Sequence, residues 1–344
     1  MNILSYNANN ARYFSLLFHE SIDDWNRYFN DPPPTPYSDG SNKYWKSNSP
    51  GKYFVTDCKF GDLKATCIWI KSIGPNYLGI SETEFNKCSA DDGVPCTVFR
   101  NGSFFQYRVT GKDCTITTTT LNGIHTSVNV RENTKDLNLI EESSISGYSS
   151  ETSGSVLWHK NGNVSFVSIN ESNCKTRYAV GYLIYNDASR TSSTKFCQFI
   201  SNKADLMCYW HWYSQHYIHC SNYLNSSYSS TTTTTPGIFN LGSPDSLIYI
   251  SNSVIKDNSG KTLLFSNFGS SSIIVDRCFI ENPNVEMISA GYGNFKFLHK
   301  YFIYILNVPH KNCIFTDVKY KTIYVNKLCR CDSNFIYYFA FLSK

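Results

Sequence analysis

A six-residue pattern of apolar and small positions recurs along most of this 344-residue chain. It reads apolar, any, any, small, any, apolar, and ten copies occur between Val55 and Phe315. The copies occupy residues 55–60, 80–85, 111–116, 140–145, 164–169, 194–199, 218–223, 250–255, 275–280 and 310–315. Successive copies end 24 to 35 residues apart, and a period of about 20–50 residues is typical of solenoid proteins.

The spacing inside each copy predicts two short β-strands joined by a tight corner. The small residue and the closing apolar residue are two positions apart, so they lie on the same face of a strand. The first apolar residue stands three positions before the small one, and a corner with two outward residues accounts for that break in the alternation. We therefore expect an all-β, right-handed, single-stranded parallel β-helix of about ten coils, stacked at roughly 4.8 Å per coil.

Cysteine is frequent at the small position of the repeat, where Ser, Thr or Val occupies the remaining copies. The cysteines at this position are Cys58, Cys114, Cys197, Cys278 and Cys313. Because a free cysteine behaves as a small buried apolar residue, we interpret this column as core packing. The chain has 13 cysteines, an odd number that cannot all pair within one molecule. Cysteines of neighbouring coils are nevertheless close enough to bridge in an oxidising compartment.

Both ends of the chain depart from the repeat. Large apolar residues recur every three or four positions near the N-terminus, which predicts a helix over about residues 10–30. These residues are Phe14, Phe18, Ile22, Trp25 and Phe29. A solenoid needs its open ends covered, so we interpret this helix as a cap, with a membrane-surface helix as the alternative. The expected organisation is a cap and Pro-rich linker at 1–50, the β-helix at 51–320, and C-terminal strands or a disordered tail at 321–344.

Composition limits the partners and the compartment. The net charge of +4 is spread along the chain without a Lys/Arg cluster, which argues against nucleic acid as a partner. No run of roughly 18 apolar residues occurs, so we expect no transmembrane helix. The N-terminus has no secretory signature, whereas four sequence motifs for N-glycosylation favour export to the cell surface. These motifs begin at Asn101, Asn163, Asn170 and Asn225. Localisation therefore stays open.

Acidic residues precede the small position in four copies of the repeat. They are Asp57, Glu82, Asp113 and Glu142. Stacked carboxylates about 5–8 Å apart raise one another's pKa unless a cation compensates, and Lys59 and Lys112 are close in sequence. We interpret the column as a solvated acidic stripe. Rows of hard oxygen ligands also suit Ca²⁺, so these four residues are the candidate metal ligands.

Two further segments carry residue types that can do chemistry. Residues 91–93 place two acids before a glycine, and paired carboxylates hydrolyse glycosides at defined separations; two exposed acids in a turn is the plainer interpretation. Residues 210–220 combine Trp and Tyr with four metal-capable side chains, which strand spacing distributes over two faces. The aromatic rings of this segment suit either stacking on sugars or ordinary stacking between coils. The four side chains are His211, His216, His219 and Cys220.

Residues 85–94 read Phe-Asn-Lys-Cys-Ser-Ala-Asp-Asp-Gly-Val, and residues 199–204 read Phe-Ile-Ser-Asn-Lys-Ala. These segments are similar to the Phe-x-x-Asn-x-Ala-x-x-Gly-Gly repeat of bacterial polymorphic outer-membrane adhesins, although Cys88 replaces the Asn and the double Gly is absent. Over about residues 50–320 the chain resembles the right-handed parallel β-helix proteins of the pectate-lyase-like superfamily, and more narrowly the surface-type members of parasitic protists. The resemblance implies the fold, which carries lyases, hydrolases and adhesins alike.

The expected function is that of a non-catalytic scaffold or binding protein. Adhesion or surface interaction with a glycan or a protein is the favoured role, and a polysaccharide lyase or glycoside hydrolase is the alternative. The Asn-Thr-Asp, Gly-His-Gly and Arg-Ile-Lys signatures of glycosidases with this fold do not occur in the sequence. No catalytic or cofactor-binding residue is therefore assigned, and calcium is the one ion considered.

Overall fold

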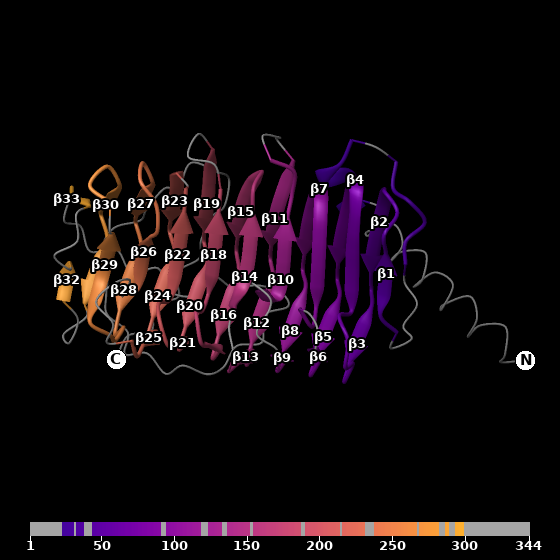
Figure 1. Ribbon diagram of the computed structural model, residues 1–344, viewed down its shortest axis with the longest axis horizontal. Helices are drawn as coiled ribbons and strands as arrows, with labels where there is room; N and C mark the ends of the chain where they lie inside the picture. The colour runs from indigo at the N-terminus through magenta and orange to yellow at the C-terminus, as the bar shows by residue number, and fades with distance from the viewer. Residues whose placement is uncertain are drawn as a thin grey trace, which may run out of the picture. The chain divides into compact units, whose positions relative to one another are not determined.

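The computed structural model is an all-β parallel solenoid, which confirms the expected fold class. Figure 1 shows its coils stacked in chain order, with each strand beside the equivalent strand of the next coil. The structure describes residues 23–30, 32–37, 43–90, 94–117, 123–132, 136–151, 154–186, 190–213, 215–230, 237–266, 268–281, 286–288 and 293–298.

Four ladders of stacked parallel strands form the walls. Ladder I contains β1 (Trp45–Ser47), β4 (Ile68–Ser81), β7 (Thr97–Tyr107), β10 (Gly123–Asn129), β14 (Ser155–Lys160), β18 (Tyr182–Tyr185), β22 (Tyr209–Trp212), β26 (Phe239–Leu241), β29 (Thr262–Ser266) and β32 (Glu286–Ile288). Ladder II contains β2 (Gly51–Thr56), the second halves of β4 and β7, β11 (Leu137–Glu141), β15 (Asn163–Val167), β19 (Thr191–Lys195), β23 (Gln215–His219), β27 (Leu247–Ser251), β30 (Ser272–Asp276) and β33 (Asn294–Phe297).

The other two ladders are built from shorter strands. Ladder III contains β3 (Lys59–Gly61), β5 (Glu84–Asn86), β8 (Thr110–Lys112), β12 (Ser144–Ser146), β16 (Asn170–Ser172), β20 (Gln198–Ile200), β24 (Asn222–Leu224), β28 (Val254–Lys256) and β31 (Phe279–Glu281). Ladder IV contains β6 (Ser89–Ala90), β9 (Thr115–Ile116), β13 (Ser149–Ser150), β17 (Lys175–Thr176), β21 (Lys203–Ala204) and β25 (Ser227–Tyr228).

The described part of the chain holds nine coils with a ladder III strand. The first coil begins at β1, which pairs with β4. The stacking therefore starts at residue 45, a few residues before residue 51, where we expected the β-helix to begin. The tenth copy of the repeat, at 310–315, and the expected C-terminal segment at 321–344 lie outside the described residues.

Seven copies of the repeat stack in the predicted register, as the pairing of Phe60 with Phe85 illustrates. Two predicted copies, 111–116 and 164–169, are displaced, because residues 106–111 and 166–171 are the ones that stack on their neighbours. The cause is the same in both coils. Gln106 and Glu171 occupy interior positions that apolar residues fill in the coils on either side.

The displacement moves one cysteine to a different column. Cys58, Cys197 and Cys278 share the predicted small position at the corner between ladders II and III. Cys114 instead lies above Cys88 at the corner between ladders III and IV. The prediction for Cys114 was therefore wrong in column, although its side chain is buried as expected, and Cys313 lies outside the described residues.

Each corner between ladders II and III that the structure describes contains a residue in the left-handed backbone region. The nine residues there have φ between 44° and 57°, and none of them is glycine: Asp57, Glu82, Arg108, Glu142, Ser168, Phe196, Cys220, Asn252 and Arg277. The backbone N–H of such a residue still donates to the next coil, as that of Glu82 does to the Tyr107 carbonyl at 3.1 Å.

The residue after each left-handed position explains why the small column contains Ser, Thr and Cys. The Ser221 hydroxyl donates to the His219 carbonyl at 3.0 Å and accepts the Cys197 backbone N–H at 3.2 Å. The Ser221 N–H donates in turn to the Ser253 hydroxyl of the next coil at 3.1 Å. A γ hydroxyl or thiol can donate to a carbonyl of its own coil and accept the backbone N–H of the preceding coil. Alanine at this position would leave that buried N–H without a partner.

The coil with Gly111 fills its interior differently. Gly111 occupies the position of Phe85 in the coil before it, and a Cβ there would clash with the Tyr148 side chain of the following coil. Tyr148 is fully buried and its hydroxyl lies 2.9 Å from His125 Nδ1, while His125 Nε2 lies 2.9 Å from Gln106 Nε2. A buried polar network therefore replaces apolar packing in this coil.

A short helix at residues 23–28 packs against the outer side of ladder II. Its Trp25 ring lies 5.4 Å from that of Phe54 and 6.3 Å from that of Phe105. Arg27 forms an ion pair of 2.7 Å with Glu141. The helix thus lies across several coils, and residues 10–22 of the predicted cap lie outside the described residues. No helix in the described ranges is long and apolar enough to cross a membrane.

Glu171 is a carboxyl group in the core of the solenoid. It pairs in ladder III with Ile145 and Phe199 and is fully buried. Burial raises its pKa from 4.5 to about 8, although the backbone N–H of Gly181 opposes part of that rise. The folded chain therefore holds a proton on Glu171 over a pH range in which the unfolded chain has lost it.

We predict that the free energy of unfolding falls as pH rises from about 4.5 to 8, since the folded state binds the extra proton there. The loss reaches about 5 kcal/mol at pH 8 and above. The substitution Glu171→Gln removes this pH dependence and stabilises the chain at pH 8 relative to the wild type. Denaturant unfolding at pH 5 and pH 8 measures the difference.

Glu84→Gln is the matched control, because Glu84 lies on the outer side of the same ladder in an exposed ion pair with Lys59. We expect it to shift stability by less than about 1 kcal/mol at either pH. A wild-type stability that does not change between pH 5 and pH 8 would contradict the prediction.

Candidate functional site

The outer face of ladder I presents two columns of side chains, one residue per coil. Alternation along each strand sends every second residue outward, and the parallel register places equivalent residues next to one another. One column contains Lys46, Trp69, Val98, Ser127, Trp158, Leu183 and Trp210. The other contains Lys71, Arg100, Asn129, Lys160, Tyr185 and Trp212.

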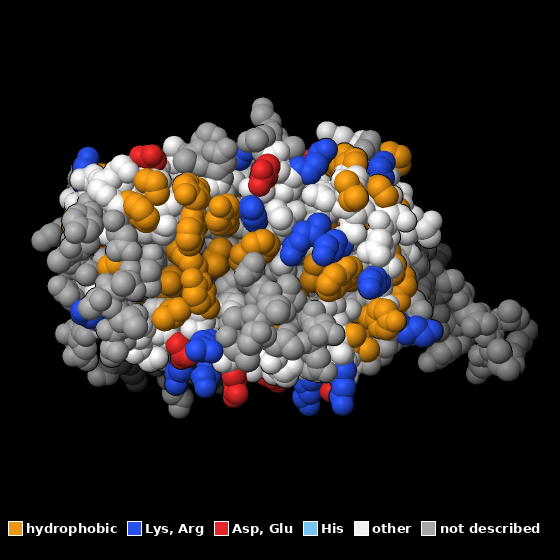
Figure 2. Space-filling view, viewed as in Figure 1, with side chains coloured by type: hydrophobic (Ala, Val, Ile, Leu, Met, Phe, Trp, Pro, Cys, Tyr) orange, Lys and Arg blue, Asp and Glu red, His pale blue; other side chains and the backbone are white. Residues whose placement is uncertain are grey.

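In the later coils these columns and the adjacent Tyr178 form an aromatic ridge, defined as Trp158, Tyr178, Leu183, Tyr185, Trp210 and Trp212. The Trp210 and Trp212 rings lie 4.8 Å apart, and Tyr185 stacks on Trp212 at 5.9 Å with an interplanar angle of 27°. Gly242 of the next coil leaves room for the Trp210 indole, since a Cβ there would clash with it. Figure 2 shows apolar side chains gathered on this face.

Cationic side chains lie over the aromatic rings of the same face. The Lys46 and Lys71 ammonium groups lie 5.6 and 5.9 Å from the centre of the Trp69 ring. The Arg100 guanidinium lies 5.4 Å from the Trp158 ring. Contacts of this kind hold a cation by its attraction to the π face. Basic side chains gather beside apolar ones in Figure 2.

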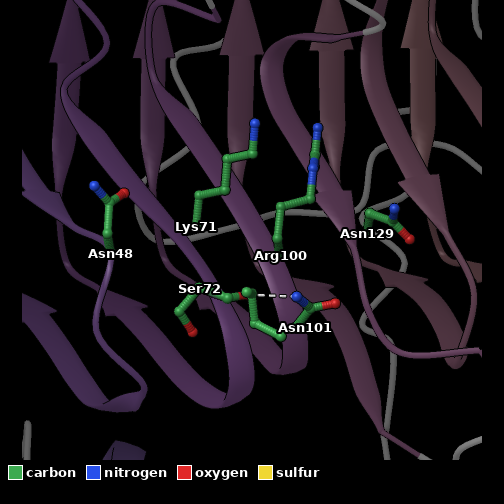
Figure 3. Close-up of a pocket in the computed structure, with 7 residues that line it drawn as sticks. Asn48, Lys71, Ser72, Arg100, Asn101 and Asn129 are labelled. Atoms are coloured by element: carbon green, nitrogen blue, oxygen red, sulfur yellow. Dashed lines mark hydrogen bonds between the residues drawn. The ribbon is translucent and has the colours of Figure 1, made fainter.

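A groove of about 490 Å³ opens at the cationic end of this face. Its lining residues are Asn48, Lys71, Ser72, Ile73, Arg100, Asn101 and Asn129. Figure 3 shows the Lys71 and Arg100 side chains extending side by side in the same direction, with Asn48 and Asn129 on either side of them. The groove therefore combines two cations with amide groups, and its lining contains no carboxylate.

A local insertion builds one wall of the groove. Lys71 pairs with Arg100 and Asn76 pairs with Gly102, so residues 72–75 loop out of β4 without partners in β7. The Asn101 amide donates to the Ser72 carbonyl across the base of the loop. Gly102 has a φ of 140° and lies so close to the Asn76 backbone that a Cβ would not fit. The insertion leaves Ile73 fully exposed at the rim.

The charge of Arg100 has no carboxylate partner among the described residues. Its guanidinium donates to the Phe99 and Ser127 carbonyls at 2.9 and 2.8 Å and to the Ser127 hydroxyl at 3.0 Å. All three acceptors are neutral. Burial lowers its pKa from 12.5 to about 10, so Arg100 remains a cation at neutral pH. The groove therefore carries positive charge that an anionic ligand would neutralise.

The predicted acidic column is only partly assembled. Glu82 and Glu142 lie in the same corner column as Asp57, but Arg108 stands between them at the corner of the intervening coil. Arg108 binds Glu82 at 3.2 Å and Glu142 at 2.9 Å. Asp113 lies at the next corner, between ladders III and IV, because its coil is displaced from the predicted register.

The predicted histidine segment is divided between core and surface. His211 and His216 both face the interior, with ring centres 4.4 Å apart, and are fully buried. Burial lowers the pKa of His211 to about 3, so the ring is neutral. His219 is half-buried on the opposite side of its strand and bonds the Ser251 hydroxyl at 2.9 Å. Within the described ranges, no group of three or more His, Cys, Asp or Glu is arranged to hold a metal ion.

Lys71, Arg100 and Asn129 were not among the residues that the sequence singled out. They lie 29 residues apart in the chain, and no local motif connects them. An alignment of the coils could have revealed them, because one outward-facing position of ladder I carries Lys, Arg, Asn and Lys in four consecutive coils. The acids at residues 91–93 lie outside the described residues.

No protein-family model matches the chain, and no curated protein or solved structure matches it either.

Calcium binding at the acidic column stays a prediction, and Arg108 occupies the position where an ion would bridge Glu82 and Glu142. We predict that millimolar calcium raises the melting temperature of Arg108→Gln by roughly 2 °C or more beyond any shift in the wild type. Thermal unfolding with and without calcium measures both shifts.

Arg131→Gln is the control for this experiment, because it breaks a different ion pair, with Asp136 at 2.9 Å. Calcium shifts that are equal in the two variants would remove the acidic column as a calcium site.

Proposed function

We propose that this chain is a non-catalytic solenoid that binds an acidic glycan along the outer face of ladder I. The role would be adhesion or another surface interaction. The observation that supports it most is the pair of cations in the groove, Lys71 and Arg100, which have no carboxylate partner among the described residues. The aromatic ridge lies on the same face and a few coils away.

Aromatic rings and cations recognise different parts of an acidic sugar chain. Flat rings such as Trp212 and Tyr185 cover the apolar faces of sugar rings, while Lys71 and Arg100 attract carboxylate or sulfate groups. The amides of Asn48 and Asn129 supply donors and acceptors for hydroxyl groups. Because the face repeats one side chain per coil, it suits a linear ligand made of repeating units better than a compact one.

A polysaccharide lyase is the second candidate, and the environment of Arg100 is the observation that favours it. A base that removes a proton beside a uronate carboxylate needs a pKa nearer to neutral, and burial moves the pKa of Arg100 in that direction, from 12.5 to about 10, although the guanidinium stays protonated at pH 7. Glycoside hydrolysis requires a pair of carboxyl groups, and the groove lining has none. Binding without turnover is therefore the function we favour.

We predict that the full chain binds a polygalacturonate oligomer more tightly than a neutral cellulose oligomer, and that added salt reduces this difference in affinity.

Lys71→Gln should lower affinity for the acidic oligomer about 3- to 10-fold at low salt, because it removes an exposed charge from the groove. Trp212→Ala should weaken both ligands. Isothermal titration calorimetry measures the affinities, and ultraviolet absorbance of unsaturated uronate products tests for lyase turnover.

Lys203→Gln is the matched control, since Lys203 is exposed in ladder IV, away from ladder I. Equal losses in Lys71→Gln and Lys203→Gln would mean that binding follows overall charge and not the groove. Turnover of the acidic oligomer would replace the binding proposal with the lyase.

A further inference from the structure

The four N-glycosylation motifs of the chain lie in four different surroundings in the fold. They begin at Asn101, Asn163, Asn170 and Asn225. In such a motif the side-chain amide nitrogen of the asparagine receives the sugar. The attached oligosaccharide is bulky and hydrophilic, so it needs open space outside the protein. The exposure of each asparagine therefore decides which glycosylated motifs the finished solenoid accommodates.

Asn163 is the first residue of β15 in ladder II. It is exposed, whereas Val164 and Phe166 of the same strand are buried, so the Asn163 side chain points out of the solenoid. The backbone N–H of Asn163 donates to the Asp136 carbonyl at 3.0 Å, and this bond does not involve the side-chain amide. A sugar on the Asn163 amide would extend into solvent and leave the strand pairing in place.

Asn225 lies at a corner between ladders III and IV. It is exposed, with a φ of 49°, and its backbone N–H donates to the Lys256 carbonyl at 3.0 Å. Its side-chain amide donates to the Ser201 hydroxyl of the preceding coil at 3.0 Å. The amide nitrogen carries two hydrogens, and glycosylation replaces one of them. The other hydrogen can keep the bond to Ser201, so the corner accommodates a glycan.

Asn170 is placed where a sugar does not fit. It pairs with Ser144 and Gln198 of the neighbouring coils and is 7% exposed. The hydroxyl residue of the same motif, Ser172, is buried as well. An oligosaccharide on Asn170 would have to open the packing around β16, so a chain glycosylated there would not complete the solenoid.

Asn101 is half-buried in the lining of the groove. Its amide nitrogen is directed at the Ser72 carbonyl, to which it donates across the base of the 72–75 loop (Figure 3). Gly102 follows in a backbone conformation that glycine favours, with a φ of 140°. A sugar on the Asn101 nitrogen would displace the loop that this hydrogen bond closes, so the folded groove excludes it.

We propose that Asn163 and Asn225 are N-glycosylated when the chain passes through a secretory pathway, and that the folded protein carries no sugar on Asn101 or Asn170. Asn163 belongs to ladder II, and Asn225 lies at the corner between ladders III and IV. Both glycans are therefore attached outside ladder I. The two sites are independent of the binding role proposed for that face.

The sugar donor is an oligosaccharide linked through a diphosphate to a membrane lipid. The asparagine amide nitrogen attacks the anomeric carbon of the first sugar, so that a C–N bond forms as the C–O bond to the diphosphate breaks. The lipid diphosphate leaves with the bonding electron pair, and the nitrogen gives up one proton to a base of the transferase. Transfer to the growing chain precedes closure of the core, so folding then selects which glycosylated chains are recovered.

The test expresses the full chain behind a cleavable secretion leader in insect cells and collects the fraction that melts cooperatively. Enzymatic removal of N-glycans in heavy-oxygen water converts each glycosylated asparagine to a labelled aspartate, and peptide mass spectrometry locates the label. We expect label at Asn163 and Asn225 in most chains, and none at Asn101 or Asn170. If little protein is secreted, the same map is made on the folded fraction extracted from the cells.

Single variants check each site by gel mobility. Asn163→Gln and Asn225→Gln should each lose one glycan, and the double variant should lose both. Asn101→Gln is the matched control, because it removes a motif of the same kind and should leave the mobility unchanged.

Two results would overturn the proposal. One is the lack of label at either Asn163 or Asn225 in the folded wild type. The other is label at Asn101 or Asn170 in that fraction. The wild-type map decides the matter even if a variant does not fold.

Discussion

The interaction on which the solenoid depends is the hydrogen bonding of a small side chain at the corner between ladders II and III, found in the described coils except the two in which Val109 and Ile169 take that position. A left-handed residue such as Asn252 turns the chain there, and the N–H that follows no longer faces a carbonyl of the next strand. The side chain of the next coil accepts that N–H, as Ser253 does for Ser221 at 3.1 Å. A buried N–H without a partner would cost about 1–3 kcal/mol, and small residues with a γ hydroxyl or thiol occupy this position in seven of the nine described corners.

These fixed corners also determine what the surface can do. With each coil held in register on the next, outward side chains repeat at roughly 4.8 Å along the stack. Trp158, Leu183 and Trp210 become neighbours although more than 20 residues separate each from the next. The groove adds a local irregularity to this regular face, because the insertion at 72–75 rises between two coils that otherwise pair directly. A linear ligand and a rigid, repeating face suit each other for this reason.

The repeat predicted the fold because its period and its alternation come from strand geometry alone, and seven copies obey both. It failed at residues 106–111 and 166–171, where Gln106 and Glu171 occupy apolar positions. Gln106 is tolerated because its amide bonds to His125 of the next coil, a contact that no single copy reveals. Because of the same displacement, we predicted the wrong corner column for Asp113 and did not predict that Arg108 occupies the corner between ladders II and III. The groove escaped prediction since it depends on the alignment of three coils around an insertion.

Distances between coils test the stacking most directly. Spin labels on unnatural side chains at residues 62, 87, 201 and 257 would lie in one corner column, and pulsed electron paramagnetic resonance would measure the separations. Stacked coils predict about 19 Å between 87 and 201, about 29 Å between 87 and 257, and about 34 Å between 62 and 257. Separations that do not grow by the same increment with each added coil would contradict the account.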